Sequence, residues 1–75
     1  MATLRRQLVL CLRNKGYVVS LERRKIYQVL PDRQAASHRQ LRVIDESGED
    51  YLYPERFFVP ITLPRTLRKA VLAAV

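Results

Sequence analysis

The sequence predicts a mainly β fold: a small, strongly bent antiparallel sheet or barrel of about five strands, followed by a C-terminal helix. Short runs of aliphatic, β-branched and aromatic residues recur along the 75-residue chain, as they do in small all-β domains. Turn-forming residues separate these runs at short intervals. The pattern changes to a helical period only in residues 64–75.

The length permits one domain over residues 1–75, with residues 1–6 expected to be frayed and residues 64–75 to form the helix. A hydrophobic fraction of 48% in a regular pattern predicts a folded chain rather than a disordered one. A chain this short buries only about 60% of its unfolded surface, so we expect a stability of roughly a few kcal/mol.

The central feature is a hairpin over residues 41–53 with a three-residue loop, Glu46-Ser47-Gly48. Glycine adopts positive φ without steric penalty, which suits the left-handed position of such a loop. The predicted pairs are Asp45/Glu49, Ile44/Asp50, Val43/Tyr51, Arg42/Leu52 and Leu41/Tyr53. Alternation then places four side chains on the core face: Leu41, Val43, Tyr51 and Tyr53.

Four carboxylates crowd the tip of this hairpin: Asp45, Glu46, Glu49 and Asp50. The simplest interpretation is a solvated tip whose repulsion is screened by salt and by nearby basic side chains. The alternative is a contact surface for a basic partner. The spacing lacks the ligand order of an EF-hand, which argues against a calcium loop.

Three further strands are expected, over residues 7–12, 26–30 and 59–63. The first is apolar on both faces, which favours a central position in the sheet. Pro31 ends the second strand, and Pro60 confines the last one to an edge or a bend, since proline cannot donate to a ladder. Phe57 or Phe58 should plug one end of the core.

The sequence pattern of the connecting segments allows more than one structure. Residues 17–21 have strand composition but are short, so strand and turn both stay open. Residues 32–40 are predicted to be a polar surface loop that can hold one helical turn capped by Asp32. His38 in this loop is expected to be exposed, because no metal-binding partner lies at ligand spacing.

The helix predicted over residues 64–75 should dock an apolar face and expose its basic residues. The docked face comprises Leu67, Ala70, Val71 and Ala74, widened by Leu72 and Val75, whereas Arg65, Arg68 and Lys69 point outward. Covering an open barrel end is the expected role; a dimer contact or fraying is the alternative.

Cys11 is the only cysteine, so the chain has no internal disulfide, and its apolar neighbours predict a buried, unreactive thiol. A single free thiol suits a reducing cytoplasm. No apolar stretch approaches the ~20 residues that cross a bilayer, and no signal peptide is evident. We therefore expect a cytoplasmic protein with no membrane partner.

The 25–30 segment Lys-Ile-Tyr-Gln-Val-Leu and the hairpin through Pro54 resemble a group of short uncharacterised bacterial proteins with SH3-like barrels. The 53–59 segment Tyr-Pro-Glu-Arg-Phe-Phe-Val is similar to the Pro-x-x-aromatic-Val segment before the last strand of SH3 domains. The resemblance covers about half the chain; it implies an SH3-like fold and no specific activity. The chain lacks tryptophan and an Ala-Leu-Tyr-Asp-Tyr strand, so polyproline recognition is not implied.

No catalytic triad, phosphate-binding loop or metal-ligand cluster occurs, so we predict a non-enzymatic protein without catalytic residues, cofactor or metal. A protein-interaction or regulatory module, monomeric or weakly dimeric, is favoured. Its candidate contact residues are Glu46, Glu49, Asp50, Leu67 and Val71.

The net charge of +7 supports a different function. Five of the seven acids lie between residues 45 and 55, so the rest of the chain is strongly basic. A basic surface attracts polyanions, so RNA or DNA binding is the alternative function. The candidate contacts for it are Arg13, Lys15, Tyr17, Arg23, Arg24 and Lys25.

Overall fold

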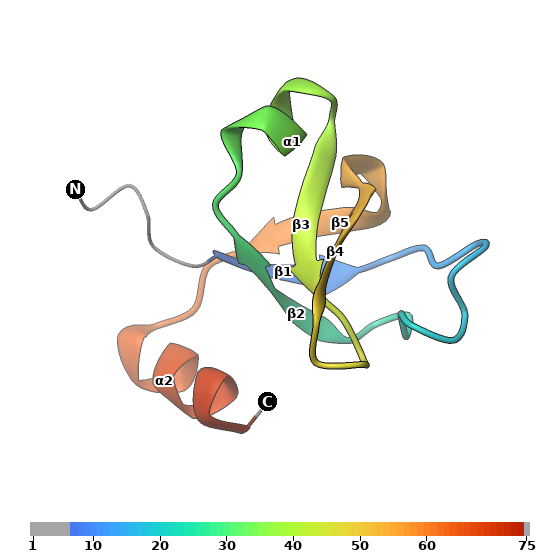
Figure 1. Cartoon of the computed structure of the whole chain (residues 1–75). Coiled ribbons are helices and arrows are strands. Elements are labelled where there is room, and N and C mark those ends of the chain that lie inside the picture. Colours follow the sequence, from blue (N-terminus) through green and yellow to red (C-terminus); the bar gives the residue numbers. More distant parts are fainter. Residues whose placement is uncertain (1–6, 75) are drawn as a thin grey trace.

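The computed structural model describes residues 7–74, with side chains through residue 71. Five strands form one antiparallel sheet in the order β4-β3-β2-β1-β5 (Figure 1). The strands are β1 (Gln7–Cys11), β2 (Ile26–Leu30), β3 (Gln40–Ile44), β4 (Asp50–Pro54) and β5 (Phe58–Ile61). The helical elements are α1 (Arg33–Ser37), the 3₁₀ turn η2 (Glu55–Phe57) and α2 (Arg65–Ala74). The prediction of a mainly β fold with a C-terminal helix is therefore confirmed.

The central hairpin has the predicted register. β3 and β4 pair as Ile44/Asp50, Val43/Tyr51, Arg42/Leu52 and Leu41/Tyr53. At the turn, the Asp45 N–H donates to the Glu49 carbonyl at 3.0 Å. Gly48 has φ +84°, the left-handed conformation that a three-residue loop requires.

The prediction of the core face is wrong for one residue, Tyr51. Val43 and Tyr53 are buried and Leu41 packs against the core, but Tyr51 is 52% exposed. β4 is an edge strand, and Tyr51 lies close to its turn, where no further strand covers it. The Tyr17 ring instead packs on Tyr53, at 4.9 Å between ring centroids.

β1 occupies an interior position, as its two apolar faces predicted. Leu8 and Val9 point to opposite faces and are both buried. Cys11 is also fully buried, which confirms its role as a small core residue. The main core cluster contains Val9, Cys11, Leu21, Tyr27, Val29, Val43, Tyr53, Phe57 and Phe58.

The sheet does not close into a barrel, so that part of the fold prediction is wrong. β4 and β5 are the two edges, and Figure 1 shows β3 and β4 crossing β1 at a steep angle. Each edge strand contains a proline, Pro54 or Pro60, which lacks the N–H that a closing ladder would need. Aromatic packing links the edges instead, with 6.4 Å between the ring centroids of Tyr53 and Phe58.

The segment 32–40, predicted to be a surface loop able to hold one helical turn, contains the short helix α1. Asp32 Oδ1 accepts a hydrogen bond from the Ala35 N–H at 2.9 Å and so caps α1. Pro60 lies in β5 at the sheet edge, where an absent N–H is tolerated, and this prediction is also confirmed.

The face of α2 differs from the predicted one. Leu67 is 55% exposed and Ala70 is exposed, whereas Arg68 and Val71 are half-buried. The helix therefore turns its Arg68–Val71 side inward, and the long stem of an arginine can cover apolar surface there. Since the sheet is open, the expected covering of a barrel end does not apply. The predicted fraying of residues 1–6 and the side chains of Leu72, Ala74 and Val75 fall outside what the structure describes.

Candidate functional site

The long connection between β1 and β2, residues 12–25, is here named the basic loop. Residues 17–21 within it form turns rather than a strand. The Asn14 carbonyl accepts from the Tyr17 N–H at 2.7 Å, and the Tyr17 carbonyl accepts from the Leu21 N–H at 2.8 Å. The Asn14 side chain donates to the Leu21 carbonyl at 3.0 Å, which closes the loop on itself.

The basic loop is also tied to the hairpin and the core. Leu21 is fully buried in the core cluster. The Ser20 carbonyl accepts from the Glu46 N–H at 3.0 Å, and the Ser20 hydroxyl lies 2.8 Å from the Tyr53 hydroxyl oxygen, to which it can donate. These contacts hold the loop against the sheet, and sequence analysis missed them because they join residues more than twenty positions apart.

The structure brings all six predicted nucleic-acid contacts onto this one loop. Four of its cations are exposed and make no ion pair with any residue from 7 to 71: Arg13, Lys15, Arg23 and Arg24. Lys25 differs, because its ammonium lies 2.8 Å from Glu46. Tyr17 is 38% exposed, and its ring makes T-shaped contacts with the rings of Tyr53 and Phe57.

The tip of the basic loop is apolar. Val18 is 72% exposed and Val19 is 92% exposed, and Leu12 at the base of the loop is also exposed. Single exposed aliphatic residues are ordinary on a protein surface, but here two consecutive valines are exposed at one tip.

The expectation of a solvated acidic tip is wrong for Asp45. This carboxylate is buried and accepts three hydrogen bonds, from the Ser47 N–H at 2.8 Å, from Ser47 Oγ at 2.5 Å and from the Tyr53 hydroxyl at 2.5 Å. Burial raises the pKa of Asp45, but these donors outweigh it and hold the pKa below its ordinary value. Burial and the neighbouring Asp45 carboxylate raise the pKa of Tyr53.

Glu46 is likewise engaged within the chain. It accepts from Lys25 Nζ at 2.9 Å and from the Tyr27 hydroxyl at 2.5 Å. The Lys25 ammonium first, and the Tyr27 hydroxyl second, hold the pKa of Glu46 below its ordinary value. Burial, followed by the hydrogen bond to Glu46, raises the pKa of Tyr27. Glu46 is therefore tied to β2, although residues 46–50 of the tip are exposed to solvent.

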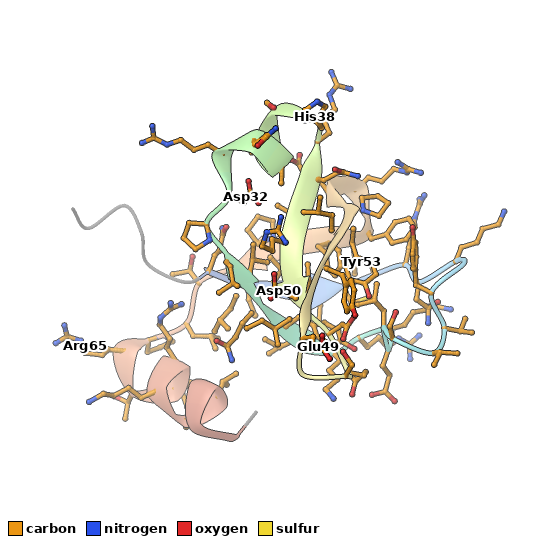
Figure 2. All side chains as sticks on the ribbon, in the orientation of Figure 1. Asp32, His38, Glu49, Asp50, Tyr53 and Arg65 are labelled. Carbon is orange, nitrogen blue, oxygen red and sulfur yellow. The ribbon has the colours of Figure 1, made fainter. Side chains whose placement is uncertain are left out.

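The remaining predicted protein contacts lie on separated surfaces. Asp50 lies 3.0 Å from Arg42, which also binds Asp32 at 2.7 Å. Glu49 is exposed and has no ion-pair partner within the described part of the chain. Figure 2 shows Glu49 and Asp50 on the hairpin, well apart from Arg65 on α2. The structure therefore does not combine the hairpin tip with Leu67 and Val71 of α2 into one site.

His38 is exposed, and its Nδ1 lies 2.9 Å from the Gln34 carbonyl oxygen. Residues 7–71 contain no group of three side chains placed to hold a metal ion. Every buried side-chain donor and acceptor in the same range has a hydrogen-bond partner.

Comparisons of the chain with protein-family models, with curated proteins and with solved structures find no match. Neither α1 nor α2 is long and apolar enough to cross a membrane.

Proposed function

We propose that the protein is a small, non-enzymatic module that binds another protein through the basic loop. The observation that carries this proposal is the exposure of Val18 and Val19 on a loop that is already fixed to the core by Leu21 and Ser20. Burying exposed aliphatic side chains drives protein association. A preordered loop also loses little conformational freedom on binding, which leaves more of that gain as affinity.

The charges around the tip define the partner's chemistry. Arg13, Lys15, Arg23 and Arg24 make no ion pair among the residues whose side chains are described, and Glu22 is the only acid in the basic loop. A partner with an acidic rim around an apolar depression would complement this surface, and the long-range attraction would speed their encounter. The free thiol of Cys11 supports a reducing compartment such as the cytoplasm.

Nucleic-acid binding through the same loop is the second candidate. The four unpaired cations favour it, because phosphate neutralisation dominates such affinity. The valine tip does not favour it, because aliphatic side chains cannot stack on bases as aromatic rings do. Tyr17, the one aromatic residue among the predicted contacts, is already engaged by the rings of Tyr53 and Phe57.

Two matched double variants separate these candidates. Val18→Ser with Val19→Ser removes the apolar tip and keeps every charge, whereas Arg23→Gln with Arg24→Gln removes two cations and keeps the tip. Arg33→Gln, an exposed cation on α1, is the control. Immobilised protein would capture partners from a nuclease-treated lysate, and gel shifts with RNA and DNA would be run from ~50 to ~200 mM salt.

We expect the valine variant to lose the captured protein and the control to retain it. A gel shift at low salt that the arginine variant loses and the valine variant keeps would instead establish nucleic-acid binding. Nuclease-resistant protein capture that is unaffected by the valine variant would overturn the proposal.

A further inference from the structure

The outer edge of β4 offers backbone hydrogen-bonding groups in a regular pattern. Asp45 bonds to Glu49 at the turn, and the Glu55 N–H donates to the Arg39 carbonyl at 2.9 Å beyond the other end of the hairpin. Bonded and non-bonded pairs alternate along an antiparallel ladder. The positions 45/49 and 39/55 therefore fix the bonded pairs between them as 43/51 and 41/53.

It follows that Asp50 and Leu52 direct their peptide N–H and C=O groups away from β3. Within residues 7–74, β4 pairs with β3 alone, so no strand meets these outward groups. Pro54, the next outward position, has only a carbonyl and ends the usable edge. An added strand would thus bond mainly to Leu52, with Asp50 beside it.

The side chains around this edge define what it would accept. Tyr51 and Leu52 point to opposite faces of the sheet, and they are 52% and 38% exposed. Glu49 and Glu55, just beyond the two ends of β4, are exposed and have no ion pair among the residues whose side chains are described. The edge therefore combines exposed apolar side chains with acidic ends.

A second copy of the chain fits this edge poorly. Antiparallel pairing of two β4 strands about Leu52 would place Glu49 of one copy opposite Glu55 of the other, and like charges opposite each other destabilise a ladder. A basic strand would instead place cations near Glu49 and Glu55, and opposite charges across a ladder stabilise it.

We propose that β4 accepts an extended, basic segment of another protein, which adds as a further strand with its alternate apolar side chains beside Leu52 and its basic side chains on the opposite face, beside Tyr51 and the acidic ends. Main-chain hydrogen bonds supply affinity in this binding mode, and the flanking side chains supply specificity. The site is separate from the basic loop, so it can fail or succeed independently of the function proposed above.

The test uses a seven-residue peptide of alternating lysine and valine, with binding followed by fluorescence anisotropy and by NMR shifts of the Leu52 amide. Leu52→Pro removes the outward N–H without breaking the β3 ladder, and Leu52→Thr is the matched control that keeps it. A peptide with alternate N-methylated residues probes the same bonds on the unaltered protein. A lysine–proline peptide retains charge but cannot form a strand ladder.

We expect at least about a 10-fold loss of affinity, or roughly 1.4 kcal/mol, for Leu52→Pro and for the N-methylated peptide. Leu52→Thr should retain affinity within about threefold, and Glu49→Lys with Glu55→Lys should weaken binding. Equal binding of the lysine–proline peptide would reduce the effect to simple charge attraction and overturn the proposal. Failure of the lysine–valine peptide to bind, or β4-mediated dimers of the protein alone in sedimentation, would also overturn it.

Discussion

Replacing Tyr53 with phenylalanine removes one hydroxyl and leaves the ring in place. That hydroxyl donates to the buried Asp45 carboxylate at 2.5 Å and lies 2.8 Å from Ser20 Oγ. Hydrogen bonds to charged groups contribute about 1.5–3 kcal/mol, and a buried carboxylate that loses a donor regains no water in exchange. We therefore expect Tyr53→Phe to lower the free energy of unfolding by about 2 kcal/mol at pH 7.

Urea denaturation followed by circular dichroism measures this loss, and each 1 kcal/mol should lower the Tm by about 4–8 °C in a domain of this size. Tyr51→Phe is the matched control, because its side chain is 52% exposed and its hydroxyl has no hydrogen-bond partner within residues 7–71. It should change stability by less than about 0.5 kcal/mol.

The pH dependence provides a second check of the same interaction. The folded pKa of Asp45 lies below its ordinary value of about 3.9, so its contribution is present above that pH and is lost as pH falls through the folded pKa. Tyr53→Phe removes a donor to Asp45 and so raises the pKa of Asp45 in the folded state. The loss of unfolding free energy caused by Tyr53→Phe should therefore be full at pH 7 and shrink below about pH 4. A cost that equals that of Tyr51→Phe, or that stays constant down to pH 3, would refute the reasoning.

Three further predictions concern the turn, the loop and the thiol. Gly48→Ala should cost about 1 kcal/mol by denaturation from backbone strain alone, since φ is +84° and nothing lies within 4 Å of the added Cβ; a cost near zero would contradict it. Leu21→Ala should cost about 2–5 kcal/mol and speed hydrogen exchange of the Glu46 amide, which bonds the adjacent Ser20 carbonyl, whereas Val19→Ala should do neither. Burial raises the pKa of Cys11, so thiol reagents should modify it slowly in buffer and quickly in denaturant; equal rates would contradict its burial.

The parts of the fold that the sequence predicts correctly depend on local chemistry. Gly48 fixes the turn, and alternation on either side of it fixes the register, so the hairpin needs no distant information. Asp32 likewise caps the helix that begins directly after it. Pro60 excludes a central strand wherever the rest of the chain lies.

The errors arise where distant segments decide the outcome. Tyr51 and Tyr53 share a face and a composition, yet the basic loop covers only Tyr53. The sequence does not distinguish Asp45 from the other acids of the tip, because its burial depends on hydrogen bonds from Ser47 and Tyr53. Leu21 follows two exposed valines and Ser20 and precedes a charged run, so no periodicity identifies it as a core residue.

The pairing of charges within the fold explains why the basic loop stays unneutralised. Asp45 is satisfied by hydroxyl and amide donors rather than by a cation. Asp32 and Asp50 share one guanidinium, that of Arg42, so two acids neutralise a single base. Glu46 takes only Lys25, at the end of the loop next to β2. Four of the seven acids are thus engaged by other groups, and Glu22 is the one acid within the basic loop. Most of the positive charge of the loop is therefore available to an outside partner, and salt should weaken that attraction.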